Sequence, residues 1–251
     1  MTSHVGVSAR SDIGAVRHVN EDGFLAEDPV YVVADGMGGH ARGDLASQTA
    51  VASLARTLQP GTRPTPDEVI AAIDEANAAV RALSGVDESG PAVAGTTLAG
   101  VVRVRVPERA AEQWMVVNVG DSRVYAWDGT TLSQLTVDHS AVQELVDAGL
   151  ITEAQAAVHP ERNIITRALG AEDFVDTDSE LLPDEGRRVF VICSDGLTRE
   201  LSDSRIAAIL AAQPDDPAGA LVEAAVEAGG HDNVTVLVIA ADEADATTVI
   251  S

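Results

Sequence analysis

The chain has 251 residues, 45% of them hydrophobic and 22% charged, which is enough to bury the core of one large domain or of two small ones. Its net charge of −24, from 40 acidic and 16 basic residues, disfavours binding to nucleic acid or anionic membranes and favours divalent cations or basic partners. All 16 basic residues are arginines. This excludes enzymes that need a lysine, such as Walker P-loop proteins, protein kinases and Schiff-base enzymes.

Nothing in the sequence indicates a membrane span or a secreted protein. No run reaches the ~18 apolar residues of a spanning helix, and the first residues lack the apolar segment of a signal peptide. A single cysteine, Cys193, leaves no internal disulfide. We therefore expect a cytoplasmic monomer that binds neither nucleic acid nor membrane.

The first half of the chain combines short strands with one pair of helices. Apolar runs predict strands at residues 4–14, around Phe24 and at 30–34, and helical spacing predicts helices at 45–58 and from 66 or 67 to about 83. Residues 85–91 are predicted to form a loop. Strands are then expected at 95–106, 114–120, 123–128 and 131–135, the last two joined by an Asp-Gly turn. This half therefore predicts antiparallel sheet.

The second half begins with an excursion from the sheet. Residues 138–170 lack a strand pattern and predict a flap with short helices at 140–148 and 152–157. Strands are then expected at 174–182, 189–194 and 233–240, with helices at 203–212 and 217–228. Paired strands and paired helices predict an α+β sandwich of two sheets with helices outside. We expect one domain over residues 1–241 and a flexible tail at 242–251.

Four aspartates stand at the ends of predicted strands. Asp35, Asp121 and Asp195 each follow an apolar strand, and Asp232 precedes another. The glycines at 36, 38 and 39 allow the backbone to approach a ligand, so peptide carbonyls can face the same point as Asp35. One Asp-Gly pair alone favours a structural turn, but four such acids favour a shared site.

Converging carboxylates point to a metal centre. They cannot all ionise without cations, because each raises the pKa of the others. Oxygen ligands without His or Cys select Mg²⁺ or Mn²⁺. Two such ions about 4 Å apart would turn a bridging water into a hydroxide nucleophile, for which a phosphate ester is the natural target. Arg17 would clamp the phosphate, unless it is a surface arginine paired with Glu21.

Six motifs follow one another along most of the chain. They are Arg17-x-x-Asn20-Glu21-Asp22, Asp35-Gly-Met-Gly-Gly-His40, Gly95-Thr-Thr97, Gly120-Asp-Ser-Arg123, Ser194-Asp-Gly196 and Asp232-Asn233. From about residue 4 to 240 the chain resembles the bacterial form of the metal-dependent protein phosphatases of the 2C type. The resemblance implies an αββα sandwich, hydrolysis of phosphoserine and phosphothreonine in phosphoproteins, and a signalling role beside a Ser/Thr kinase and its substrates.

The resemblance also implies roles for individual residues. Asp35 would bridge two Mn²⁺ or Mg²⁺ ions, with the Gly36 carbonyl on one of them and Asp195 and Asp232 completing the pair. Asp121 and Asp195 would hold a third, weaker ion, and Arg17 would bind the substrate phosphate. Glu21 and Asp22 would lie behind the ligands and act through metal-bound waters. Asn233 would also lie behind the ligands. The flap would border the cleft and influence substrate choice.

The chain departs from the family pattern at one position. Animal members carry a histidine directly after the first Asp-Gly, proposed as the general acid, and this chain has Met37 there. Protonation of the leaving group would fall to water or to another group. His40 and His231 are close in sequence, but we expect both to be structural.

Three alternatives remain open. Cys193 to Arg199 fits the C-x5-R loop of cysteine-dependent phosphatases, although Asp195 would oppose the phosphate and an apolar strand would raise the pKa of the thiol. Asp176-Thr-Asp178 is similar to the paired aspartates of another phosphatase superfamily, whose lysine has no candidate here. The third alternative is a metal-binding regulatory module without turnover.

Overall fold

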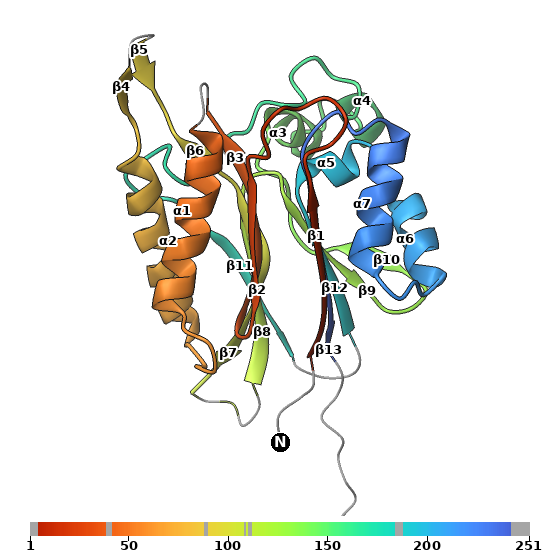
Figure 1. The fold of residues 1–251 in the computed structure, drawn as a ribbon, viewed down its shortest axis with the longest axis horizontal. Helices are drawn as coiled ribbons and strands as arrows, with labels where there is room; N and C mark the ends of the chain where they lie inside the picture. The colour runs from red at the N-terminus through yellow and green to blue at the C-terminus, as the bar shows by residue number, and fades with distance from the viewer. Residues whose placement is uncertain are drawn as a thin grey trace, which may run out of the picture.

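Two antiparallel β-sheets stack face to face, and a pair of helices covers each outer face (Figure 1). The computed structural model describes residues 5–38, 42–87, 90–107, 109, 112–183 and 188–241. None of its helices within these ranges has both the length and the apolar character needed to span a membrane. The predicted α+β sandwich is confirmed.

The elements divide between the two halves of the sandwich. One sheet has the strand order β1 (Val5–Asp12), β13 (Val234–Ala241), β12 (Arg188–Cys193), β9 (Arg123–Trp127) and β10 (Leu132–Gln134). The other has the order β11 (Asp178–Pro183), β8 (Glu112–Val119), β7 (Leu98–Arg105), β3 (Val30–Met37) and β2 (Asp22–Glu27), with β6 (Gly95–Thr96) paired to β3. The covering helices are α1 (Gly43–Thr57) and α2 (Pro66–Arg81) on the second sheet and α6 (Asp203–Ala211) and α7 (Pro217–Ala228) on the first (Figure 1).

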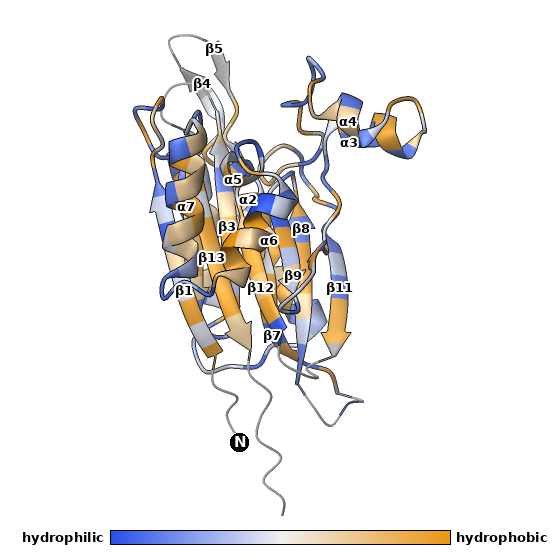
Figure 2. Ribbon diagram, turned by 90° about the vertical axis from the view of Figure 1, so that its right-hand side faces the viewer, coloured by the Kyte–Doolittle hydropathy of each residue, from blue (hydrophilic) through white to orange (hydrophobic). Residues whose placement is uncertain are grey.

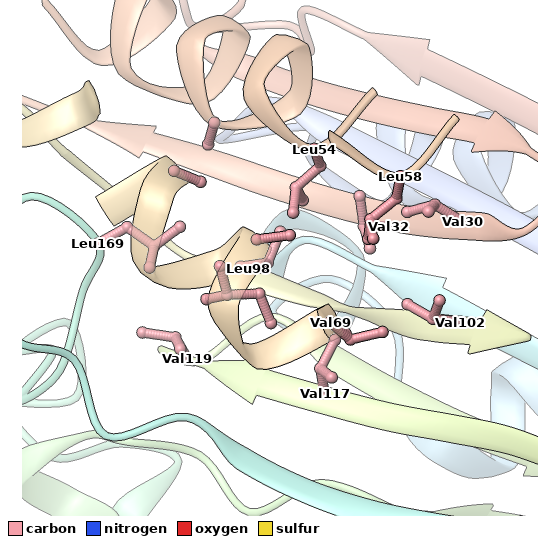
Figure 3. Close-up of a cluster of buried hydrophobic side chains, with 14 of the residues drawn as sticks. Val30, Val32, Leu54, Leu58, Val69, Leu98, Val102, Val117, Val119 and Leu169 are labelled. Carbon is pink, nitrogen blue, oxygen red and sulfur yellow. The ribbon is translucent and has the colours of Figure 1, made fainter. Parts of the chain in front are cut away.

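Strand β3 is buried on both faces, which explains its unbroken apolar sequence. Val30 and Val32 pack into the core beneath the helix pair, where Figure 3 shows them near Leu54 of α1 and Leu58 directly after it. The alternate residues of β3 belong to the core between the two sheets. A strand covered on both sides needs apolar residues at every position, so it lacks the alternation of a half-exposed strand.

Aromatic rings join the two sheets at the centre of the sandwich. The ring centroid of Trp114 lies 6.0 Å from that of Tyr31 and 5.2 Å from that of Phe190. These rings are tilted, an arrangement that aromatic pairs favour. Because Phe190 comes from β12 and the other two from β3 and β8, the cluster fixes one sheet against the other.

Two of the predicted helices, α2 and α7, begin at recognisable caps. Thr65 and Glu68 form a capping box at the start of α2, and Pro66 occupies its first turn. Asp216 caps α7 by accepting a hydrogen bond from the backbone of Gly219. In the flap, α3 (Ala141–Asp147) and α4 (Glu153–Ala156) extend beyond the end of the sandwich (Figure 2).

Several predicted boundaries were wrong. Strand β3 does not end before Asp35 but continues to Met37, since Asp35 pairs with Asp22 and Gly36 with Thr96. Strand β11 begins at Asp178 rather than at 174, because residues 171–174 form turns and Phe174 is exposed. Two elements were not predicted where the sequence offered too few residues for a pattern: the hairpin β4 (Gly85–Asp87) with β5 (Gly90–Ala92), and the short helix α5 (Asp195–Thr198). The predicted tail, 242–251, lies outside the described residues.

Candidate active site

The predicted acids gather at one edge of the sandwich, the upper edge in Figure 1. Strands β3, β8 and β12 run towards this edge, and β2 and β13 begin there, as the register of their pairing requires. Asp22 and Asp35 are direct partners on adjacent strands. Asp195 opens α5 directly after β12, and Asp232 lies just before β13. Residues separated by more than 200 positions in sequence therefore share one edge.

The backbone of Asp35 is held by two threonines. Its N–H donates to Oγ1 of Thr97 over 2.9 Å, and its carbonyl accepts from Oγ1 of Thr96 and from the N–H of Thr97, both at 2.9 Å. Oγ1 of Thr97 also lies 2.7 Å from Oγ of Ser122, the residue after Asp121. No role was predicted for the threonine pair, and the structure shows that it connects two acidic motifs.

Electrostatics confirm that the carboxylates share one environment. The pKa of Asp35 is raised well above its ordinary value, first by burial and then by Asp22, Asp195, Asp121 and Asp232. Burial, followed by repulsion from Asp121, likewise raises the pKa of Asp195 to about 8. Such mutual repulsion is the state that bound cations would relieve.

Asp22 is buried between the two sheets. Its Oδ2 accepts hydrogen bonds from Oγ of Ser194 at 2.8 Å and from Oγ1 of Thr235 at 2.7 Å, both on the opposite sheet or its end. Burial raises its pKa to about 6, although these two hydroxyl groups act in the opposite direction. Asp22 therefore links the sheets directly behind Asp35.

Among the described residues at the acidic edge, three buried carboxylate oxygens accept no hydrogen bond: Oδ1 of Asp22, of Asp121 and of Asp195. A buried anionic oxygen without a partner is unfavourable, and a hard divalent cation satisfies it. In the described part of the chain, however, no group of three or more His, Cys, Asp or Glu side chains forms a ready-made set of metal ligands. The donor set fits Mg²⁺ or Mn²⁺ in its chemistry, but its side chains would have to adjust to bind one.

Arg17 pairs with Asp232 rather than with Glu21. Its Nη2 donates to Oδ2 of Asp232 over 2.9 Å, and 47% of its side chain remains exposed. The alternative of an Arg17–Glu21 surface pair is therefore wrong. The Glu21 carboxylate instead lies against Gly43 at the start of α1. Arg17 thus stands at the acidic edge with a guanidinium that solvent can reach.

Asn233 positions the loop that carries Arg17. Its Nδ2 donates to the carbonyls of Ile13 and Val19, each at 3.0 Å, and its Oδ1 accepts from the N–H of Glu21 at 2.9 Å. These bonds fix both ends of the segment around Arg17. Asn233 therefore holds the Arg17 loop next to the acidic edge.

Arg199 is the residue that sequence reasoning missed. It follows α5, and its Nη2 forms an ion pair with Oδ2 of Asp195, four positions earlier. Its Nη1 lies 3.2 Å from Oδ2 of Asp232. The spacing to Asp195 is a signal for such a pair on a helix, but only once α5 is known to be helical.

A cavity of about 1040 Å³ separates the acidic edge from the flap. Its wall includes Asp121, Asp195 and Asp232 on one side and residues of α3 and α4 on the other. Two interactions hold the start of the flap: Arg123 binds both oxygens of Asp138, and Nδ1 of His139 accepts the N–H of Gly120 at 3.0 Å. The flap is therefore attached next to the Asp121 turn.

The structure disfavours the cysteine mechanism. Cys193 is fully buried, and burial raises the pKa of its thiol to about 12, so a thiolate is not available at neutral pH. The phosphatase superfamily with paired catalytic aspartates is disfavoured as well. Its candidate acids, Asp176 and Asp178, form ion pairs with Arg167.

Of the two histidines close in sequence to the acidic motifs, His231 lines the cavity. Nδ1 of His231 is 2.7 Å from a carboxylate oxygen of Glu200, an interaction in keeping with a structural role. His40 lies outside the described residues. Met37, at the end of β3, has no acid–base chemistry.

The raised pKa values predict how stability depends on pH without metal. Burial raises the pKa of Asp22 and Asp121 to about 6 and that of Asp195 to about 8. The folded protein thus keeps protons that the unfolded chain releases near pH ~4, so folding is favoured at low pH and loses stability as pH rises through these values. With EDTA, we expect a lower Tm at about pH 8.5 than at about pH 5.5, and a larger increase with Mn²⁺ at the higher pH. Scanning fluorimetry measures both; a Tm of the EDTA-treated protein that rises with pH would contradict the account.

Known proteins share both the sequence and the fold. The family described as protein phosphatase 2C matches residues 17–214. The serine/threonine phosphatase stp of Listeria welshimeri is 38% identical over 244 residues, which cover 92% of this chain and 93% of the relative. The PPM Ser-Thr phosphatase MsPP from Mycobacterium smegmatis, solved with cacodylate, has a TM-score of 0.82 at 37% identity and covers 97% of this chain and 100% of its own.

A further solved structure is the catalytic domain of the serine/threonine protein phosphatase PstP in complex with two manganese ions. It has a TM-score of 0.78 at 35% identity and covers 95% of this chain and 99% of its own. These matches confirm the predicted family and the enzyme class that it implies. With most of its length matched and its α+β sandwich shared, the chain belongs to the protein phosphatase 2C family of serine/threonine phosphatases.

Proposed function

We propose that this protein hydrolyses phosphoserine and phosphothreonine in proteins at a centre of two Mn²⁺ or Mg²⁺ ions. Asp35, the Gly36 carbonyl, Asp195 and Asp232 would hold this pair, and Asp121 with Asp195 would hold a third, weaker ion. The proposal is supported by the partnerless oxygens of Asp121 and Asp195 and by the manganese complex of the related PstP domain. When bound, the ions lower the pKa of a coordinated water so that it can attack phosphorus at neutral pH.

The chain's own residues bind and orient the substrate. Arg17 is exposed enough to exchange its contact with Asp232 for two oxygens of a phosphate group, which its planar fork matches. Asn233 holds the Arg17 loop in place through three hydrogen bonds. Glu21 and Asp22 would support the ions through water molecules. The leaving group would take its proton from water or from another group, since Met37 cannot supply one.

The proposal also covers the domain, the flap and the partners of the protein. Residues 1–241 would form one phosphatase domain, with residues 138–170 as a flap that borders the cleft and influences substrate choice. The contribution of α3 and α4 to the cavity wall supports this role of the flap. The partners would be phosphoproteins, among them a Ser/Thr kinase and its substrates. We propose that the protein works as a monomer in the cytoplasm.

The observation that carries the proposal is the meeting of Asp35, Asp195, Asp232 and Arg17 at one edge of the sandwich. The corresponding experiment is release of inorganic phosphate from a phosphothreonine peptide. We expect turnover with Mn²⁺, none after treatment with EDTA, and recovery when excess Mn²⁺ is added back. A protein that binds Mn²⁺ but releases no phosphate would instead be the regulatory module considered above.

A further inference from the structure

Arg199 pairs with one carboxylate oxygen of each of two proposed metal ligands, Asp195 and Asp232. Its guanidinium is paired with Oδ2 of Asp195 and lies 3.2 Å from Oδ2 of Asp232. The Asp195 side chain is only 10% exposed and that of Asp232 18%, so this cation neutralises carboxylates that solvent hardly reaches. The proposed reaction assigns no task to Arg199.

A guanidinium and a divalent cation compete for these oxygens. Oδ2 of Asp232 already accepts from both Arg17 and Arg199, which leaves little room for a metal ion at that atom. A guanidinium and a divalent metal ion bind the same lone pairs of a carboxylate oxygen, and their positive charges repel each other when both contact one oxygen. A metal ion that binds Asp232 through Oδ2, or that binds both oxygens of Asp195, therefore requires Arg199 to move.

We propose that Arg199 is the internal counter-ion of the metal centre: it holds Asp195 and Asp232 when no metal is bound and leaves them when a divalent cation binds. This inference rests on the proposed function, because it takes both aspartates as metal ligands.

The surroundings of Arg199 allow this exchange. Its side chain is 35% exposed and lines the cavity of about 1040 Å³ between the acidic edge and the flap. The guanidinium can therefore turn into solvent-filled space without disturbing the core. Its backbone would stay fixed, because its N–H donates to the carbonyl of Asp195 over 2.9 Å. Release from the aspartates would leave the Arg199 guanidinium free on the cavity wall that Arg17 also lines.

If Arg199 competes with the metal ion, the apparent metal affinity is the intrinsic affinity multiplied by the fraction of protein in which the aspartates are free of Arg199. The substitution Arg199→Gln removes the competitor and keeps a side chain of similar reach. We expect it to tighten Mn²⁺ binding on the order of tenfold, within the usual range of coupling between two sites. We also expect a lower Tm in EDTA, because the acids lose their counter-ion, and hence a larger rise of Tm on adding Mn²⁺.

Isothermal titration calorimetry with MnCl₂ and scanning fluorimetry in EDTA measure these two effects. The matched control is Arg205→Gln, which removes the same charge from an exposed position on the neighbouring helix α6 and should change neither quantity. If Arg199→Gln does not fold without metal, Arg199→Lys keeps the charge on a single donor point and should give intermediate Mn²⁺ affinity.

The outcomes separate this inference from the proposed function. Equal or weaker Mn²⁺ binding by Arg199→Gln would overturn the counter-ion role. If Mn²⁺ binding were unchanged and the KM for phosphopeptide raised, Arg199 would instead be a substrate-binding residue. Asp195→Asn serves as the reference, since it should lose Mn²⁺ binding whether or not Arg199 competes. Failure of the unaltered protein to bind Mn²⁺ would contradict the proposed function itself.

Discussion

Replacing Asp35 by Asn is expected to lower kcat roughly a thousandfold or more. Asn has the same shape but no charge, so the backbone bonds to Thr96 and Thr97 can remain while the candidate bridging ligand is lost. Metal ions contribute several kcal/mol to transition-state stabilisation, and a loss of about 4 kcal/mol corresponds to about a thousandfold in rate.

The same substitution is expected to raise the Tm of the metal-free protein. Asp35 is repelled by Asp22, Asp195, Asp121 and Asp232, and an uncharged amide removes this repulsion. Steady-state kinetics with a phosphothreonine peptide and scanning fluorimetry in EDTA test the two effects together. Asp74→Asn, at an exposed position of α2, is the matched control and should change neither. If Asp35→Asn were nearly as active as the unaltered protein, Asp35 would not be a ligand of the metal centre.

Replacing Gly36 by Ala is the second change with a large expected effect. A Cβ at this position would clash with the carbonyl oxygen of Gly43 and lie 2.5 Å from that of Glu21. Both obstacles are backbone atoms, so relief requires α1 or the loop before β2 to move away from β3. Overpacking costs typically about 1–3 kcal/mol, and we expect the upper end of that range because no flexible side chain can give way.

Activity should fall together with stability, since the shift displaces the Gly36 carbonyl, a candidate metal ligand. Urea denaturation gives the loss of unfolding free energy, and calorimetry with MnCl₂ gives the loss of metal affinity. Gly6→Ala in β1 is the control, because the nearest atom to its new Cβ would be the Ala240 side chain at 3.6 Å, an ordinary contact. A Gly36→Ala protein as stable as Gly6→Ala would show that the close approach of β3 and α1 is not required.

The sequence predicted the sandwich and the placement of its acids because both depend on local patterns. An unbroken apolar run such as that of β3 indicates burial on both faces, and an acid that follows such runs repeatedly indicates a shared edge. The caps of α2 and α7 are likewise local signals, so the structure has these helices where they were predicted. The ends of β3 and β11 depend instead on pairing with distant strands, which local patterns do not reveal.

The supporting interactions of the site could not be predicted for the same reason. Thr97 reaches Asp35 across 62 positions, and Asn233 reaches Glu21 across 212, so neither bond leaves a trace in sequence spacing. Arg199 was visible only as the last residue of a rejected cysteine motif. Its proximity to Asp232 depends on α5 and β13 meeting at the same edge.

The most direct test of this account is a crystal structure of the protein grown with MnCl₂, with anomalous scattering used to locate manganese. We predict two strong peaks at the edge of the sandwich, bridged by Asp35, with Asp195 and Asp232 as ligands and the Arg199 guanidinium turned into the cavity. Manganese bound elsewhere, or absent while Asp35, Asp195 and Asp232 stay bound to protein groups alone, would contradict it.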